Sequence, residues 1–263
     1  MPEGDTIWRA ARALDAALGG RTVTSFRSPL ASVAAAARRF GLVGRPVERV
    51  EAKGKHLLVR FGGGAVLHTH QGMTGSWHLY RRGSRWRQAA HLARVVLEAG
   101  EVVAVCFRAP RIELLTAPEV ARHGALSRLG PDVVAEAFEP AAARARLRAA
   151  GDAEIGAAVL DQTRVAGIGN VYKSEVLFLC GLRPFQRVAD LDDSALDRII
   201  ATARRQMRRN LDAVSRRTTG VAAGKHWVYR RAGRPCLRCG TTVERRMQGD
   251  PPRSTYFCPR CQP

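Results

Sequence analysis

Cys236-Leu237-Arg238-Cys239 and Cys258-Pro259-Arg260-Cys261 close a chain of 263 residues as two tight cysteine pairs. Eighteen residues separate the pairs, and this spacing is typical of a tetrahedral zinc ribbon. Four thiolates complete the coordination shell of zinc, so no position remains for a substrate. The sequence therefore predicts one structural zinc ion, and any chemistry must lie elsewhere. The four predicted ligands are Cys236, Cys239, Cys258 and Cys261.

The ribbon and the whole chain are strongly basic. Five arginines in the ribbon face only Glu244 and Asp250, and the chain has 43 Lys and Arg against 23 acids, a net charge of +20. This excess predicts salt-dependent binding to a polyanion. A genome that favours Arg codons is the alternative explanation, and the Ala- and Arg-rich stretch 141–150 fits it. Nucleic-acid binding is preferred because the charge coincides with the ribbon.

The remaining cysteines and the lengths of the apolar segments bear on the cellular location of the protein. Cys106 and Cys180 stand singly in apolar surroundings, which indicates packing in a reducing environment. The polar start at 2–5 does not resemble a signal peptide, and no apolar run approaches the length of a membrane span. We therefore expect a cytoplasmic, nucleoid-associated monomer with no membrane segment.

The first half of the chain predicts a helix followed by strands. Asp5 can cap a helix that runs to Leu18, where two glycines end it. Two pairs of strand-like segments with glycine turns predict hairpins, and together an antiparallel sandwich. The predicted hairpins are His56–Phe61 with Ala65–Thr69 and Arg94–Glu98 with Glu101–Phe107.

From about Pro118 the pattern becomes helical. An Ala/Arg segment follows Pro140, further helices are predicted at Glu154–Gln162 and Asn170–Cys180, and Asn170 is placed to cap the second. An apolar stripe from Leu196 to Val214, with arginines opposite, predicts a long amphipathic helix. Composition predicts three domains, at residues 1–117, 118–224 and 225–263, with the link 218–224 leading to the ribbon.

The segment 161–170 joins two predicted helices through a turn with Gly167 and Gly169. Glycine allows close approach of a phosphate, and the following helix offers N–H groups at its positive end. Asn170 can cap that helix or donate to a phosphate. An ordinary αα-hairpin is the alternative, but the basic flanks favour contact with a nucleic-acid backbone over reading of bases.

The start of the chain offers a reactive amine. Removal of Met1 would expose the secondary amine of Pro2, and an α-amino group titrates near ~8. Such an amine can attack the sugar C1′ and form an iminium. Glu3 is placed beside it as a general acid or base. By itself, Pro-Glu at a terminus is weak evidence.

Four motifs occur in a fixed order along the chain, and with the cysteine spacing they are highly specific. They are Met-Pro-Glu-Gly at the start, Lys53-Gly54-Lys55-His56-Leu57-Leu58, Leu160-Asp161-Gln162 with Gly167-Ile168-Gly169-Asn170, and Arg253-Ser254-Thr255-Tyr256-Phe257 before Cys258. Over nearly its full length the chain resembles the formamidopyrimidine-DNA glycosylase / endonuclease VIII family.

The resemblance implies an α+β multidomain fold. It consists of an N-terminal antiparallel β-sandwich with an N-terminal helix, a helical helix–two-turn–helix domain and a C-terminal zinc-finger β-hairpin. It also implies a bifunctional bacterial enzyme of base excision repair, a DNA glycosylase and abasic-site lyase, acting on double-stranded DNA that contains an oxidised base or an abasic site.

The resemblance assigns roles to seven residues beyond the zinc ligands. Pro2 matches the Schiff-base nucleophile and Glu3 the acidic catalyst; Lys55, rather than Lys53, matches a lysine that assists elimination and holds a phosphate. The others are Arg253, the finger arginine for phosphate and the last elimination; Asn170, the phosphate-binding asparagine of the turn; Met73, a wedge for the vacated base stack; and Arg128, a further DNA contact. The alternatives are surface roles for Lys55 and Arg253 and a core role for Met73.

Departures from the family pattern bear on the substrate. Asp5 and Thr6 follow Gly4 where the family continues with proline and glutamate, so any role of that second glutamate is absent or moved. The stretch 110–115 lacks the phenylalanine of the formamidopyrimidine branch, and Gly4 also favours the endonuclease VIII branch. Oxidised pyrimidines are therefore preferred as substrates.

Three alternative functions remain open. They are an oxidised-purine glycosylase, a non-catalytic DNA-structure binder, and a ribbon-bearing transcription or RNA-associated protein. His68 and His70 are interpreted as structural, because the sequence marks no carboxylate or third ligand for a metal beside them.

Overall fold

The computed structural model describes residues 2–213, 215–220 and 224–263. Val214, the last residue of the predicted stripe, and part of the predicted link 218–224 lie outside the described residues. The chain divides into two compact units, one ending at Arg128 and the other beginning at Leu129. The division into three domains with boundaries at 117 and 224 stays a prediction.

The first unit contains four helices, one 3₁₀ turn and eight strands. Their bounds are α1 (Gly4–Leu18), β1 (Ser25–Arg27), α2 (Ala31–Arg39), β2 (Val47–Lys53), β3 (His56–Phe61), β4 (Ala65–His70), β5 (Ser76–Arg81), η1 (Ala90–Leu92), β6 (Ala93–Ala99), β7 (Val102–Phe107), β8 (Arg111–Thr116), α3 (Ala117–Arg122) and α4 (Gly124–Ser127).

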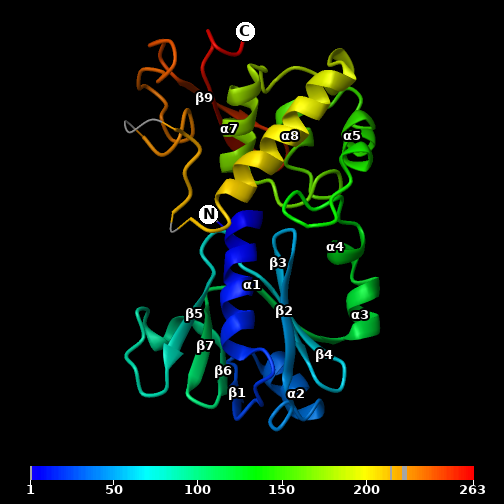
Figure 1. Cartoon of the computed structure of the whole chain (residues 1–263), viewed down its shortest axis with the longest axis vertical. Coiled ribbons are helices and arrows are strands. Elements are labelled where there is room, and N and C mark those ends of the chain that lie inside the picture. The colour runs from blue at the N-terminus through cyan, green and yellow to red at the C-terminus, as the bar shows by residue number, and fades with distance from the viewer. Residues whose placement is uncertain (1, 214, 221–223) are drawn as a thin grey trace. The chain divides into compact units, whose positions relative to one another are not determined.

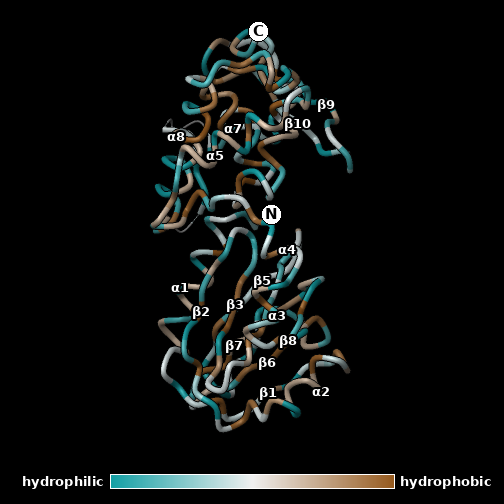
Figure 2. The backbone as a smooth tube through the Cα atoms, turned by 90° about the vertical axis from the view of Figure 1, so that its right-hand side faces the viewer, coloured by the Kyte–Doolittle hydropathy of each residue, from teal (hydrophilic) through white to brown (hydrophobic). Residues whose placement is uncertain are grey.

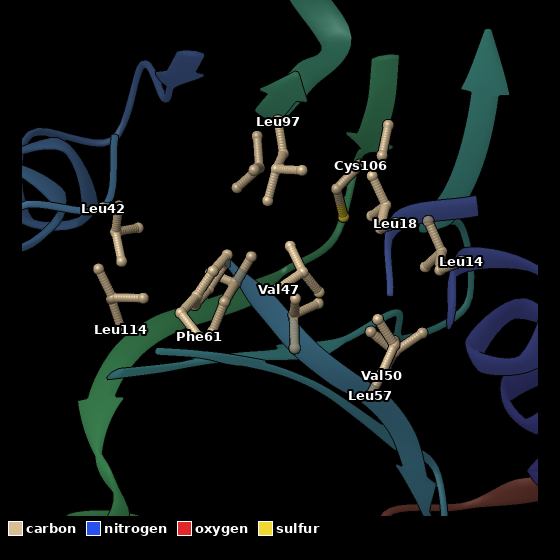
Figure 3. Packing of buried hydrophobic residues seen from close by; sticks show 14 of the residues in the cluster. Leu14, Leu18, Leu42, Val47, Val50, Leu57, Phe61, Leu97, Cys106 and Leu114 are labelled. Atoms are coloured by element: carbon tan, nitrogen blue, oxygen red, sulfur yellow. The ribbon is translucent and has the colours of Figure 1, made fainter. Parts of the chain in front are cut away.

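The strands form two antiparallel four-stranded sheets, in the orders β1-β6-β7-β5 and β2-β3-β4-β8. Both predicted hairpins are present, and each apolar strand face contributes to one core between the sheets. In Figure 2 the hydrophobic stretches run along β3, β6 and β7. Figure 3 shows side chains of both sheets and of α1 meeting in this core, among them Leu14, Leu18, Val47, Val50, Leu57, Phe61, Leu97 and Cys106.

Helix α1 lies along β2 and runs in the opposite direction (Figure 1). Ile7, Leu14 and Leu18 are buried because their spacing places them on one face of the helix. Asp5 was predicted as the helix cap, and this is wrong. The helix begins one residue earlier, at Gly4, and the N-cap position is Glu3. Asp5 therefore lies inside the first turn, where it is fully buried.

The described residues of the second unit form four helices, one 3₁₀ turn and one two-stranded sheet. Their bounds are α5 (Pro140–Arg148), α6 (Ile155–Ala158), α7 (Asn170–Cys180), η2 (Val188–Asp190), α8 (Asp193–Arg209), β9 (Glu244–Gln248) and β10 (Arg253–Phe257). Helix α7 is the centre of this unit, since α6, α8 and β10 all pack against it. Figure 1 shows α8 crossing α7, with α5 beside α8.

Three predicted helix boundaries differ from the structure. The helix predicted at 154–162 is only α6, because the chain tightens into a turn after Ala158: the N–H groups of Leu160 and Asp161 bond to carbonyls three residues back instead of four. The N-cap of α7 is Gly169, not Asn170. Helix α8 ends at Arg209, before the predicted end of its apolar stripe.

The family-level fold prediction is confirmed: a β-sandwich with an N-terminal helix, a helical unit and a cysteine-bearing β-hairpin are all present. Within the described ranges, no helix combines the length and the apolar character needed to cross a bilayer.

Candidate functional site

The start of α1 holds Pro2 and Glu3 in contrasting environments. Pro2 is half-buried, whereas Glu3 is fully buried. The backbone carbonyl of Glu3 accepts hydrogen bonds from the N–H groups of Thr6 and Ile7, at 2.9 and 3.0 Å. Glu3 is therefore the N-cap residue of a 15-residue helix, a position at which the helix dipole favours a negative charge. Asp5 interacts with Thr6 and Arg9 in the same turn.

Lys55 lies at the tip of a tight hairpin turn between β2 and β3. Lys53 pairs with His56, so the turn consists of only Gly54 and Lys55. Gly54 has φ of 59°, a conformation that suits glycine at the first position of a type II′ turn. Lys55 is half-buried there, whereas Lys53 is exposed.

The packing of α1 on β2 brings the Lys55 turn level with Glu3. The side chain of Asp15 accepts the N–H of Val50 at 2.6 Å, which fixes a common level for helix and strand. From Asp15 the helix rises about 18 Å to Glu3, and from Val50 the strand rises about 17 Å to Lys55. Figures 1 and 2 both place the β2–β3 turn at the N-terminal end of α1.

Met73 lies on a loop and is exposed to solvent. Its side chain is 62% exposed, so the core interpretation is wrong. The loop is tight because a Cβ at Gly72 would lie 2.7 Å from Pro110, and a Cβ at Gly75 would lie 2.4 Å from the carbonyl of Gln71. The two glycines therefore allow the loop to pack closely against the β7–β8 connection. A role of Met73 as a wedge stays a prediction.

Two exposed arginines of the first unit, Arg108 and Arg128, lie outside the regular strands. Arg108, which sequence reasoning missed, adopts φ of 52° and is exposed. A left-handed non-glycine residue stores strain of about 1–3 kcal/mol and often marks a functional site, but no sequence signal announces it. The predicted Arg128 is exposed at the end of α4, and its Nε donates to the carbonyl of Gly124 at 2.8 Å.

In the second unit, Asn170 bonds to the strand that carries Arg253. The side-chain Nδ2 of Asn170 donates to the backbone carbonyl of Ser254 at 2.7 Å, and Ser254 directly follows Arg253 on β10. The predicted capping role of Asn170 is therefore replaced by a bridge to the hairpin. The Oδ1 of Asn170 is buried without a hydrogen-bond partner, while Arg253 is exposed.

The side chain of Gln162 bonds to both ends of the turn before Asn170. The Oε1 of Gln162 accepts the N–H of Gly167 at 3.0 Å, and its Nε2 donates to the carbonyls of Leu160 and Ile168 at 2.7 and 3.0 Å. Gly167 has φ of 98°, which favours glycine at this position. The turn is thus fixed before any ligand binds.

Buried polar contacts fasten the β9–β10 hairpin to α7. Lys173 is fully buried and donates from Nζ to the hydroxyl of Thr255 at 2.6 Å. That hydroxyl donates to Gln248, whose amide in turn donates to Glu154 at 2.8 Å. Polar side chains on an otherwise apolar helix are the only sequence signal for these contacts.

Glu175 was also missed, and it organises the segment before the zinc ribbon. Its carboxylate accepts the N–H groups of Trp227, Val228 and Tyr229 at 2.8 to 2.9 Å, and it accepts the hydroxyl of Thr218. Burial raises the pKa of Glu175, and the four donors act against that rise. Both oxygens act only as acceptors, which fits the ionised form.

The four predicted zinc ligands form one cluster. The sulfurs of Cys236 and Cys261 lie 4.0 Å apart and those of Cys239 and Cys258 lie 3.4 Å apart. Sulfurs around a tetrahedral zinc ion lie about 3.8 Å apart, so the cluster fits the metal. Burial and the neighbouring thiols raise the pKa of Cys261 to about 12. A cation bound among the four sulfurs would favour the thiolate form instead.

A third group of side chains includes His68, which together with His70 is interpreted as structural. The Nδ1 of His68 lies 2.8 Å from Glu113 Oε2, and His123 Nε2 lies 3.1 Å from the same oxygen. The sequence marks no carboxylate beside these histidines, but the fold places Glu113 against His68. Glu113 lies about 45 positions from His68 in the sequence and reaches it only through the register of β4 and β8.

The structure thus gathers the predicted residues in two groups. Pro2, Glu3 and Lys55 share one end of the first unit, while Asn170 and Arg253 share the α7–β10 contact of the second. Met73 and Arg128 lie on other loops of the first unit. This combination defines a class of protein, a β-sandwich that begins with a helix at Pro2 and Glu3, followed by a helical unit with a four-cysteine finger.

Comparison with known proteins agrees along the whole chain. Residues 1–112 match the formamidopyrimidine-DNA glycosylase N-terminal domain, residues 129–221 the formamidopyrimidine-DNA glycosylase H2TH domain, and residues 233–263 the zinc finger found in FPG and IleRS. The chain therefore belongs to the formamidopyrimidine-DNA glycosylase / endonuclease VIII family, and the single structural zinc site is confirmed.

The relatives lie in the endonuclease VIII branch. "Probable endonuclease 8 2" of Streptomyces coelicolor is 43% identical and is aligned over 100% of this chain and 94% of the relative. "DNA-(apurinic or apyrimidinic site) lyase Nei2" of Mycolicibacterium smegmatis is 37% identical over 100% and 99%. A crystal structure of Lactococcus lactis Fpg with abasic-site DNA has a TM-score of 0.85 at 22% identity, over 99% of each chain, which shows the shared fold.

Proposed function

We propose that this protein is a bifunctional DNA glycosylase and abasic-site lyase of base excision repair, acting on double-stranded DNA in the bacterial cytoplasm. The observation that supports this most directly is the pairing of a half-buried Pro2 with a fully buried Glu3 at the positive end of α1. The endonuclease 8 relatives cover the entire chain, and their bacterial sources favour the same setting.

In the proposed reaction the nitrogen of Pro2, freed of Met1, attacks C1′ of an extruded nucleotide. The N-glycosidic bond breaks and the base leaves with a proton. The C1′–O4′ bond then opens, O4′ takes up a proton, and an iminium joins Pro2 to the ring-opened sugar. Glu3 supplies or accepts the protons of these steps. The iminium makes the C2′ proton acidic, so its removal expels the 3′ phosphate, and a second elimination expels the 5′ phosphate.

The basic residues of the proposal act on the phosphates. Lys55 holds a phosphate and assists elimination from the hairpin turn beside Glu3. Asn170 and Arg253 hold the strand from the α7–β10 contact, and Arg253 assists the last elimination. Arg128 adds a backbone contact, and the exposed Met73 fills the space left by the extruded base.

We propose oxidised pyrimidines as the substrates. Gly4 and the stretch 110–115, which lacks the phenylalanine of the formamidopyrimidine branch, support this choice. The name endonuclease 8 of several relatives supports it as well. Oxidised purines are the second candidate, because a Lactococcus lactis Fpg of the same fold has been crystallised with a Fapy-dG-containing DNA.

Parallel assays on matched duplexes test this proposal. Duplexes with thymine glycol, 8-oxoguanine or a preformed abasic site are incubated with the protein and with a variant that retains one extra residue before Pro2. We expect incision of thymine glycol and of the abasic site, less incision of 8-oxoguanine, and none of these with the blocked variant. A binder without catalysis would retain all three duplexes and cut none.

A further inference from the structure

Four side chains gather on the face of the β2-β3-β4-β8 sheet that points away from the core. His56 pairs with His70, and His68 pairs with Glu113, across three neighbouring strands. Paired residues share a face, and residues two apart on a strand share it as well. The intervening Leu57 and Leu67 point to the core. His123, from the end of α3, completes the group.

Hydrogen bonds join the group into a chain. His56 Nδ1 lies 2.8 Å from His68 Nε2, and His68 Nδ1 lies 2.8 Å from Glu113 Oε2. His123 Nε2 lies 3.1 Å from the same oxygen. His56 and His68 are almost completely buried, at 7% and 0% exposure. The chain therefore runs from beneath the sheet surface at His56 to the half-exposed carboxylate of Glu113.

The carboxylate fixes the direction of every hydrogen bond in this chain. An ionised carboxylate only accepts, so His68 must carry its proton on Nδ1. The Nε2 of a neutral His68 is then an acceptor, and His56 must donate from Nδ1. His70 is fixed separately, because its Nδ1 accepts the N–H of Gly72 at 3.3 Å and leaves the proton on Nε2.

The surroundings keep the histidines uncharged. Burial, followed by the neighbouring histidines and Arg111, lowers the pKa of His56 to about 3. Burial, followed by Lys55, lowers the pKa of His70 to about 4. The same Lys55 and Arg111 disfavour a bound metal cation. The two nitrogen–oxygen distances at Glu113 are also those of hydrogen bonds, although His68, Glu113 and His123 lie close enough for a metal.

The chain ends at the base of the Lys55 turn. His56 is the first residue of β3 and directly follows Lys55 in a turn of two residues. The His56 and His70 rings lie 4.9 Å apart between centroids, and Lys55 is close enough to act on the pKa of His70. Whatever fixes the His56 ring therefore also fixes the strand end from which Lys55 projects.

We propose that Glu113 is a positioning residue for Lys55: through His68 it fixes the proton position and the ring orientation of His56, on which the Lys55 turn rests. This inference depends on the proposed function, since Lys55 acts in the eliminations. The DNA itself need not touch Glu113. What matters is the polarity of the chain, because a reversed hydrogen-bond direction would turn the lone pair of His68 Nδ1 toward the carboxylate of Glu113, which can only accept.

Variants of Glu113 and His68 test the polarity directly. Strand cleavage of a preformed abasic site is measured under single-turnover conditions, with binding to a duplex that holds a reduced, uncleavable abasic site. Glu113→Gln removes the charge and can either accept from or donate to His68 Nδ1 by turning its amide, so it no longer imposes one tautomer. We therefore expect cleavage to slow about tenfold while affinity stays within about twofold. The ring nitrogens of His56, followed by ¹⁵N NMR, should change from Nδ1–H to a mixture of tautomers.

His68→Gln separates polarity from packing. A glutamine can donate to Glu113 with its amide nitrogen and accept from His56 with its oxygen, as His68 does. We expect His68→Gln to cleave within about threefold of wild type and His68→Leu to lose about tenfold. Because both residues act in one chain, the double variant Glu113→Gln/His68→Leu should be no slower than either single variant.

Glu51→Gln is the matched control. Glu51 carries a carboxylate on the same sheet, and this carboxylate bonds to Arg60 at 2.6 Å. The Glu51→Gln protein should therefore cleave at the wild-type rate and keep the wild-type histidine tautomers. The inference is overturned if Glu113→Gln cleaves at the wild-type rate, if His68→Gln is as slow as His68→Leu, or if the loss in rate only follows a loss in affinity.

Borohydride trapping separates this inference from the proposed function. If wild type forms a crosslink through Pro2 and Glu113→Gln cleaves normally, the role of Glu113 fails and the function stands. If wild type forms no crosslink through Pro2, the proposed function fails whatever the Glu113 variants do.

Discussion

The two units hold their proposed site residues by different physical means. In the first, Pro2, Glu3 and Lys55 stand at the ends of regular elements packed on one hydrophobic core. In the second, Asn170 and Arg253 are placed by buried polar side chains and a cysteine cluster. The first arrangement depends on apolar area, and the second on hydrogen bonds and a metal.

The difference has a consequence for robustness. A core of many apolar contacts loses stability gradually when one contact is removed, whereas a buried polar group that loses its partner is left unsatisfied. Substitutions in the second unit should therefore act more locally and more severely on DNA binding. The following experiments separate the two units on that basis.

The largest effect is expected from loss of zinc. Cys239→Ala removes one of four thiolates, and structural zinc contributes about 10–16 kcal/mol to the folding of small finger peptides. The β9–β10 hairpin should then lose its order, and affinity for abasic-site DNA should fall more than about a hundredfold. Zinc content and DNA binding are measured together.

Calorimetry of the full chain supplies the control for that experiment. Chelation should lower or remove the transition of the second unit and leave the transition of the first unchanged. Normal DNA affinity in metal-free Cys239→Ala would contradict the placement of Arg253 on a zinc-dependent hairpin.

The second effect concerns Glu175. Glu175→Ala leaves three buried backbone N–H groups and a hydroxyl without their acceptor, which should cost about 3–5 kcal/mol of unfolding free energy. Denaturant unfolding measures this loss. Glu119→Ala, at the exposed cap of α3 in the first unit, is the comparison and should cost about 1 kcal/mol. Equal losses would mean that the two units do not differ in the way described.

The third effect is a pH dependence of the first unit. The pKa values of His56 and His70 are lowered from 6.5 to about 3 and about 4, so the unfolded chain takes up protons that the folded chain does not. The free energy of unfolding is therefore highest above pH 6.5 and decreases as the pH falls below that value. At pH 5 each histidine should cost about 2 kcal/mol.

Unfolding of the full chain between pH 7.5 and pH 5 checks this loss. His56→Gln should reduce the pH dependence, while His91→Gln, a change at an exposed histidine, should leave it unchanged. A flat profile in the wild type would show that the histidine chain is not buried in solution.

Regular elements of both units were predictable because their signals are local. The stripe of Ile7, Leu14 and Leu18 predicts α1, and the cysteine spacing predicts the zinc cluster. Helix α7 follows from the glycine turn before it and Gly181 after it. In each case a few neighbouring residues decide the outcome.

The contacts that position the site were not predictable, because they join distant segments. Glu175 binds residues about 50 positions away, and His68 meets Glu113 only through strand register. The same holds for Asp5, whose capping signal is overridden by burial of the first helical turn. Asn170 likewise finds a carbonyl on β10 that no local pattern reveals.

The central claim is that a terminal imino nitrogen performs the chemistry at the sugar. Its most direct test is reduction of the protein with borohydride during reaction with abasic-site DNA, followed by peptide mass mapping. The account predicts a single covalent adduct, on Pro2, in a chain that lacks Met1. An adduct on a lysine side chain, or full incision by a chain that quantitatively retains Met1, would contradict it.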